Sequence, residues 1–256
     1  MKDILEYSKQ AANDYPFVYQ DTIESDFRDG FNKVLVEHES KLLEKISNYG
    51  PDYNILKKDL RYRRPINYER FYDFDYTKLS SFLFSSYSYA YSVGGQQAYK
   101  DFNQDKIFKL DALNAIEISK NSNLGVSRIY ESYKNLILSK LKVGFNKDYS
   151  FGQFFDDLSG YSDFSKSDIS YTSPMPSKEN FIDNYATREV TRNVNEGRLS
   201  GYNRTRRVLK YIYKTRADER VSSICAPWHN RILNPDEVKN KLPQHRNCRC
   251  TIVPYI

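Results

Sequence analysis

The sequence lacks the many cysteines of small secreted proteins, a secretory signal and a lipid-facing apolar run. It contains only three cysteines in 256 residues, and its opening, MKDILEYSKQ, lacks the apolar stretch of a secretory signal. Its long uncharged run, Leu79 to Tyr99, includes six serines, a Gly-Gly pair and a Gln-Gln pair, and this polarity argues against a lipid-facing helix. We therefore expect a cytosolic protein with no membrane partner, in which a structural disulfide is not the default use of cysteine.

The composition is that of a folded, soluble protein whose basic residues are concentrated near the C-terminus. Apolar residues make up 39% and charged residues 28% of the chain, which is typical of globular domains. Up to Ser177 there are 23 Lys and Arg against 25 Asp and Glu, whereas from Lys178 onward there are 16 against 8. Such a basic segment suits nucleic acid or an acidic protein surface, although a solvated basic face is the plainer interpretation.

Hydrophobic periodicity predicts a mainly helical first half. Apolar residues recur at helical spacing over 21–48 and over 123–143. The segment 85–92 (SSYSYAYS) fits either a strand or a helix. The stretch 149–177 is rich in Ser, Tyr and Asp and ends near two prolines, so we expect a linker or an extended arm.

The last third predicts a small α+β module. A helix is expected over 179–207, with Ala186, Gly197 and Gly201 on one narrow face, where small side chains would let another backbone approach closely. Strands are expected over 208–215 and 250–255. A short helix over 234–241 would begin with a capping box formed by Asn234 and Glu237.

These elements predict an α+β fold with three parts. We expect a mainly helical region over 1–148, the linker over 149–177 and the α+β module over 178–256. A cluster of cysteine and histidine residues would close the module.

That cluster is the most specific candidate site. Alternate residues of a strand share a face, so Cys248 and Cys250 would point together and Arg249 away from them. His245 is one tight turn before Cys248, and Cys225 would lie in the turn after the first strand. The set Cys225, His245, Cys248 and Cys250 has the ligand types and number that structural zinc favours. The alternatives are buried free thiols, a disulfide or a catalytic thiol.

The same residues give little support for catalysis. Cys225 and His229 could form a thiol–imidazole pair, and His229, Asn230 and His245 faintly resemble a His-Asn-His metal nuclease. No acidic residue stands at a spacing that would orient either histidine. We therefore expect no enzymatic activity.

Arg249 is predicted to form an ion pair on the far side of the last strand. Because it points away from the thiols, we expect it to pair with a carboxylate, with Asp218 and Glu189 as the best candidates. Loss of one partner of a partly buried pair should cost a few kcal/mol.

Four blocks of the last third carry a family resemblance. They are ATREVTRNVNEGR (186–198), TRADERVSSIC (215–225), WHNRI (228–232) and HRNCRCTIVP (245–254). In this order they closely resemble the C-terminal module of the phage Mu F-like head morphogenesis family, which are minor capsid proteins of tailed phages. The segment 141–158 also resembles the family's region before the long helix, where a glycine and a Ser-initiated helix recur. The matching positions are Arg188, Glu189, Asn195, Gly197, Arg198, Asp218, Arg220, Val221, Cys225, Asn247, Cys248, Arg249 and Cys250.

The sequence also departs from the family pattern. Arg246 stands where proline is usual, and Ser222 and Ser223 occupy a region where many members have another cysteine. Asn230 stands where a turn glycine is common, although Asn tolerates the left-handed conformation. The first two departures make a bound metal less secure without changing the resemblance.

The resemblance implies a minor head protein of the virion. Such a protein would be present in few copies at the portal vertex and would act in head morphogenesis and in packaging or delivery of DNA. Its partners would be the portal protein, the major capsid or scaffolding protein and phage DNA, and it would lie in the host cytoplasm during assembly. The helical N-terminal half would dock on portal or capsid protein. The alternative is a zinc-stabilised nucleic-acid-binding protein or nuclease that uses the basic module.

Contact with DNA is predicted for one basic segment. The stretch 204–216 interleaves basic residues with tyrosines, and its cations could contact phosphates without reading bases. The competing interpretation is contact with acidic loops of the portal or with solvent. The candidate residues are Arg204, Arg206, Arg207 and Lys210.

Overall fold

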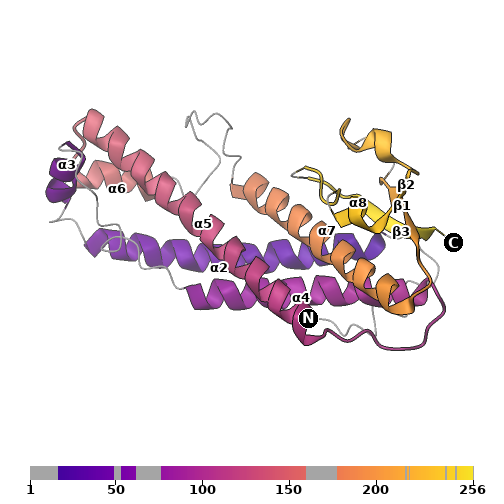
Figure 1. The fold of residues 1–256 in the computed structure, drawn as a ribbon. Helices are drawn as coiled ribbons and strands as arrows, with labels where there is room; N and C mark the ends of the chain where they lie inside the picture. The colour runs from indigo at the N-terminus through magenta and orange to yellow at the C-terminus, as the bar shows by residue number, and fades with distance from the viewer. Residues whose placement is uncertain are drawn as a thin grey trace. The chain divides into compact units, whose positions relative to one another are not determined.

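The computed structural model describes residues 17–48, 53–61, 76–159, 178–216, 218, 220–239, 241–245 and 247–255. The predicted α+β class is confirmed: long helices are followed by a small sheet (Figure 1). None of the described helices is long and apolar enough to cross a membrane. The elements are α2 (Val18–Asn48), α3 (Tyr53–Arg61), α4 (Tyr76–Lys100), α5 (Ala112–Asn146), α6 (Phe151–Ser159), α7 (Lys178–Thr205), β1 (Lys210–Lys214), the 3₁₀ turn η4 (Ala226–Trp228), β2 (Ile232–Leu233), α8 (Pro235–Lys239) and β3 (Thr251–Tyr255).

The chain forms two compact units, each assembled from segments that are distant in sequence. Unit 1 comprises Met1–Gly30, Phe84–Lys120 and Ile182–Ile256, and unit 2 comprises Phe31–Leu83 and Asn121–Phe181. The units therefore divide the chain differently from the expected boundaries at 148 and 178, because α2, α4 and α5 each contribute to both. Periodicity predicts a helix but not which partner each of its ends will contact.

The ambiguous segment 85–92 lies inside α4 and is helical. The predicted helix over 123–143 is also helical, but α5 begins earlier, at Ala112. Asp111 caps this earlier start, because its Oδ1 accepts a hydrogen bond of 2.8 Å from the backbone N–H of Asn114. An Asp placed three residues before the donating amide is a common N-cap pattern, so this earlier start could have been predicted from the sequence.

The expectation of a linker over 149–177 is wrong for Phe151–Ser159, which forms α6. Ser150 and Gln153 form a reciprocal capping box: Ser150 Oγ accepts from the Gln153 N–H at 3.3 Å, and Gln153 Oε1 accepts from the Ser150 N–H at 2.9 Å. The result agrees with the Ser-initiated helix that the family resemblance implied. Residues 160–177 lie outside the described residues.

Close packing between α4 and α7 holds unit 1 together. A Cβ added at Gly197 would lie 1.9 Å from the Tyr91 carbonyl oxygen, and one added at Gly94 would lie 2.0 Å from the Val194 carbonyl oxygen. A Cβ at Gly201 would meet Ala98 and Gly95. The small face predicted for the long helix is thus confirmed, and the two backbones touch where side chains are absent.

The sheet has strand order β2-β1-β3, and both pairings are antiparallel (Figure 1). Tyr211 and Tyr213 of β1 are fully buried, whereas the alternate residue Lys210 is exposed. The strand β2, which was not predicted, has only two residues. It follows a turn in which Asn230 adopts a positive φ of 64°, as its tolerance of that conformation suggested. The capping box of α8 is confirmed, because Glu237 Oε2 accepts from the Asn234 N–H at 2.8 Å.

Unit 2 is packed largely through aromatic rings. Phe31 stacks on Phe82 with ring centroids 6.2 Å apart and an interplanar angle of 9°. Tyr53 of α3 stacks on Phe154 of α6 with centroids 5.1 Å apart. Such pairs add modest energy beyond the apolar area that they bury.

Candidate functional site: the cysteine and histidine cluster

Cys225, His245 and Cys248 meet in the interior of the C-terminal module. The Cys225 and Cys248 sulfurs are 3.9 Å apart, and His245 Nε2 is 3.1 Å from the Cys225 sulfur. Their three ligand atoms all lie within 4.8 Å of one another. Cys225 is at the start of η4, and a turn closed by the Cys248 N–H and the His245 carbonyl presents the other two. The predicted convergence of these residues therefore occurs.

Cys250 belongs to the same cluster. It precedes β3, is 5% exposed, and its thiol interacts with those of Cys225 and Cys248. These interactions, together with burial, raise the pKa of the Cys250 thiol, whereas hydrogen bonds from Cys225 and Cys250 lower the pKa of the Cys248 thiol. Tyr213 donates a hydrogen bond of 3.4 Å to the Cys225 sulfur. The three thiols therefore lie in one buried core, in which Cys225 and Cys248, with His245, form the closest group of ligand atoms.

A polar stripe on α7 fixes the backbone around the cluster. Thr191 Oγ1 donates to the Cys248 carbonyl at 2.7 Å, and Asn195 Nδ2 donates to the Cys250 carbonyl at 3.0 Å. Asn195 Oδ1 accepts from the Ile252 N–H at 3.2 Å. These residues are four apart on the helix, so they share one face.

Arg198 continues this stripe. Its Nη1 donates to the Ile252 carbonyl at 2.9 Å and to Thr251 Oγ1 at 2.8 Å, and its Nε donates to Gln97 of α4 at 3.0 Å. The arginine is 2% exposed, so these bonds compensate the cost of burying its charge. Asn195 therefore accepts from the backbone N–H of Ile252, and Arg198 donates to its backbone carbonyl. Without these two side chains, both backbone groups would be unpaired at the edge of the sheet. The positions matched to the family included Asn195 and Arg198 but not Thr191, although the block 186–198 contains all three.

Arg249 forms the predicted ion pair. Its Nη2 donates to both carboxylate oxygens of Asp218, at 2.9 and 2.7 Å. Glu189, the other candidate, instead accepts from Arg192 at 2.8 Å and is 2% exposed. The ion pair therefore links the turn at Asp218 to Arg249, which lies between Cys248 and Cys250.

Three further residues of the family pattern lie at the surface. Arg188 has a side chain that is 41% exposed and is 3.9 Å from Glu189. Arg220 is 72% exposed and is 4.0 Å from Asp218. Asn247 is exposed.

The basic candidates for DNA contact are not equivalent. Arg204 pairs with Asp111 at 2.6 Å, donates to the Lys109 carbonyl and lies over the Phe108 ring at 4.4 Å. It is therefore used within unit 1. Arg206, Arg207 and Lys210 are exposed.

His229 does not face Cys225 as a thiol–imidazole pair would require. Its Nδ1 instead accepts from the Thr215 N–H at 3.2 Å and lies 2.7 Å from Thr215 Oγ1. The imidazole beside Cys225 is that of His245. The Cys225 side chain is 1% exposed.

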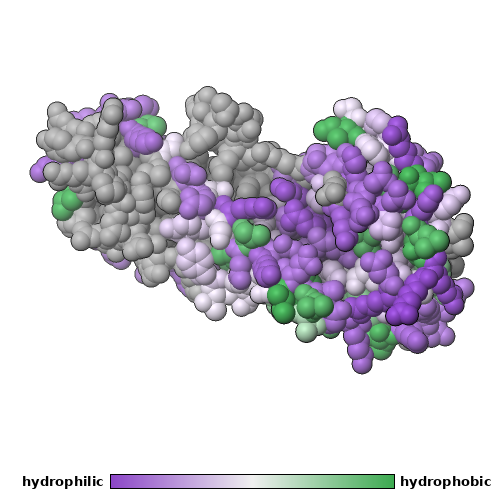
Figure 2. Space-filling view, viewed as in Figure 1, coloured by the Kyte–Doolittle hydropathy of each residue, from purple (hydrophilic) through white to green (hydrophobic). Residues whose placement is uncertain are grey.

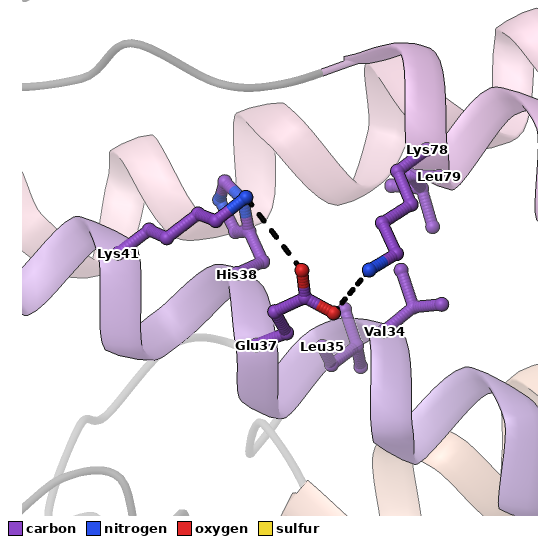
Figure 3. Close-up of a pocket in the computed structure, with 7 residues that line it drawn as sticks. All are labelled: Val34, Leu35, Glu37, His38, Lys41, Lys78 and Leu79. Carbon is purple, nitrogen blue, oxygen red and sulfur yellow. Dashed lines mark hydrogen bonds and ion pairs between the residues drawn. The ribbon is translucent and has the colours of Figure 1, made fainter.

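Among the described residues, two of the cavities lie outside the cluster. In unit 2, Glu37 lies between Lys41 and Lys78 beside a cavity of about 20 Å³, which has room for about one water molecule (Figure 3). In unit 1, a cleft of about 760 Å³ is lined by residues of α4, α5, α7 and α8, including Glu117 and Glu196. Burial raises the pKa of Glu196 to about 7, with Arg192 opposing the shift and Glu117 and Glu189 adding to it.

The visible surface around the C-terminal module is mostly hydrophilic, and its hydrophobic residues form small separate groups (Figure 2). Single exposed apolar residues such as Leu209, which is 82% exposed, are ordinary in soluble proteins.

Together, these contacts define a small α+β module in which one helix clamps a three-stranded antiparallel sheet over a buried cysteine and histidine cluster. Residues 174–253 match the family described as Phage Mu protein F like protein, so the resemblance of this module is confirmed. No curated protein and no solved structure matches the chain. The family match points to phage head morphogenesis and to the virion.

Proposed function

We propose that this chain is a minor structural protein of a tailed-phage head, associated with the portal vertex and acting in head assembly and in packaging or delivery of DNA. The observation that carries the proposal is the family match over 174–253. The matched blocks converge in one module, where their buried residues bond to one another and to backbone. Residues with such contacts stabilise the fold rather than catalyse a reaction.

The same architecture supports a non-enzymatic role. A nucleophilic cysteine must be accessible to its substrate, but Cys225 and Cys248 are 1% and 0% exposed. The partners proposed are the portal protein and the major capsid or scaffolding protein. Phage DNA is a further proposed partner, because the last third of the sequence carries the excess of basic residues.

A second candidate function is sequence-independent nucleic-acid binding. Arg206, Arg207 and Lys210 are exposed near one another in sequence, and cations of this kind can contact phosphates. A nuclease would additionally turn over DNA in the presence of a divalent metal.

Copurification from infected cells tests the proposed function. A tagged chain, crosslinked in the cell, should enrich the portal protein above other head proteins, and a tagged unrelated cytoplasmic protein provides the control. Purified protein incubated with DNA and divalent metal should show no cleavage beyond that of a chelated sample. Metal-dependent cleavage, or enrichment of DNA-processing enzymes without head proteins, would favour the second function.

A further inference from the structure

We propose that Cys225, His245, Cys248 and Cys250 bind one zinc ion in a closed structural site. This inference does not depend on the proposed role in the phage head. It concerns a ligand of the module itself, and it rests on the geometry, burial and surroundings of the cluster.

The geometry suits tetrahedral coordination. Two thiolates on one zinc ion, each at about 2.3 Å, would have sulfurs about 3.8 Å apart, and the Cys225 and Cys248 sulfurs are 3.9 Å apart. His245 presents Nε2 to the same space, 3.1 Å from the Cys225 sulfur. A small outward movement of the ring would provide room for the metal between nitrogen and sulfur. Cys250, two residues after Cys248 and buried in the same core, is the fourth ligand of the proposed Cys₃His set, beside the three whose ligand atoms lie within 4.8 Å of one another.

The surroundings suit a structural site rather than a catalytic one. The three cysteines are 0–5% exposed and belong to the hydrophobic core of the module, and the fourth ligand, His245, is half-buried. Zinc would neutralise thiolates that burial alone would disfavour. Closed sites with four protein ligands are the structural class of zinc sites.

The ligands are also held in place by a second set of contacts. Tyr213 donates to the Cys225 sulfur and itself accepts from Gln244 Nε2 at 3.3 Å. Thr191 and Asn195 fix the carbonyls of Cys248 and Cys250. Outer contacts of this kind orient metal ligands in proteins. The ion would therefore join three segments that α7 already positions: the turn at 222–225, the turn at 245–248 and the start of β3.

The test uses the full chain, purified under reducing conditions. Elemental analysis should find about one zinc per chain, and replacement by cobalt should produce the visible bands and the thiolate charge-transfer absorption of tetrahedral coordination. Removal of zinc by a chelator should lower the melting temperature, because binding energy at such a site is also folding energy. Added zinc, but not magnesium, should restore it.

Histidine variants provide a matched control. His245→Gln should lose the metal, whereas His229→Gln, whose ring contacts Thr215 outside the cluster, should retain about one zinc. If His245→Gln does not fold, the cobalt spectrum of the unaltered chain still decides. A folded chain without metal, whose cobalt spectrum lacks thiolate coordination, would overturn the proposal in favour of a buried thiol cluster. A chain whose mass is lower by two hydrogens, reversible by reductant, would overturn it in favour of a Cys225–Cys248 disulfide.

Discussion

The two compact units are stabilised by different kinds of contact. In unit 1, buried Thr191, Asn195 and Arg198 bond to particular backbone groups, and glycines allow α4 and α7 to touch. In unit 2, aromatic rings stack, and ion pairs such as Lys57–Asp148 lie at the surface. Replacing a buried polar residue leaves a backbone group unsatisfied, whereas one apolar ring can often be exchanged for another side chain of similar volume.

This difference between the units explains why the family match lies almost entirely in unit 1. A contact that needs one residue type leaves a distinct sequence motif, and nearly all of the match over 174–253 lies in unit 1. Packing that depends on volume and hydrophobicity leaves only a periodicity. The units can therefore be compared by making equivalent substitutions in each.

The largest contrast is expected between two glycine substitutions. Gly197→Ala would place a Cβ 1.9 Å from the Tyr91 carbonyl oxygen, so α4 and α7 must separate, and we expect a loss of about 3 kcal/mol or more in the free energy of unfolding. Gly152→Ala in α6 meets nothing closer than Ser150 Oγ at 3.9 Å and should gain up to about 1 kcal/mol from helix propensity. Urea unfolding followed by circular dichroism measures both. Equal stabilities would contradict the close approach of the two helices.

The next contrast separates two arginines that contact the same carboxylate. Arg249→Ala removes a two-bond pair with Asp218 from a side chain that is 12% exposed, and should cost about 3 kcal/mol. Arg220→Ala removes a contact of 4.0 Å from a side chain that is 72% exposed, and should cost less than about 0.5 kcal/mol. Thermal melting compares the two variants with the unaltered chain. If the melting temperature of Arg249→Ala is unchanged, this ion pair does not stabilise the module.

A pH-dependent contrast is expected for buried and exposed carboxylates. Burial raises the pKa of Glu196 from 4.5 to about 7, so the folded chain binds this proton more tightly than the unfolded chain does. Between about pH 4.5 and 7 stability should therefore fall as pH rises. At pH 8, Glu196→Gln should be more stable than the unaltered chain by about 3 kcal/mol, and the difference should disappear near pH 4.

The control is Glu44→Gln, which removes one exposed carboxylate from α2 in unit 2. Denaturant midpoints measured from pH 4 to pH 8 should be parallel for this variant and the unaltered chain. A Glu196→Gln curve that is parallel to them as well would refute the effect of burial on this group.

The smallest effect is expected for DNA. Any binding should be weak and should fall steeply with salt, because counterions are released. Because Arg204 is engaged with Asp111, the informative variant carries Glu at Arg206, Arg207 and Lys210. It should reduce the slope of log affinity against log salt by up to about 3, whereas Glu at the exposed Lys33, Lys58 and Lys142 of unit 2 should leave it unchanged. If the chain does not bind DNA at low salt, or if the two variants have equal slopes, DNA contact through Arg206, Arg207 and Lys210 is contradicted.

Local signals made much of the module predictable. The long helix, β1, β3 and the α8 capping box follow from periodicity, β-branched and aromatic residues and cap chemistry within a few neighbouring residues. The strand alternation of Cys248, Arg249 and Cys250 also predicted on which side each side chain would lie. The alternation also predicted that Arg249 would pair with a carboxylate, with Asp218 and Glu189 as the candidates, and the structure shows Asp218.

The remaining features depend on contacts between distant segments. That α2, α4 and α5 are shared between two units cannot be read from their amphipathic patterns. The role of Thr191 depends on the position of the Cys248 carbonyl, far away in sequence. The strand β2 is too short to show a pattern, and it forms because Tyr213 bonds across the turn to Arg231. The helix α6 lies in a stretch whose composition predicted a linker, although Ser150 and Gln153 carry its cap and the family resemblance implied a Ser-initiated helix there.

The most direct test of the account is quantitative mass spectrometry of purified phage heads. The chain should be found in heads after tails and free protein have been removed, at a few copies for each portal assembly and far below the major capsid protein. A protein that is abundant in infected cells but absent from purified heads and from procapsids would contradict the central claim that this is a structural protein of the phage head.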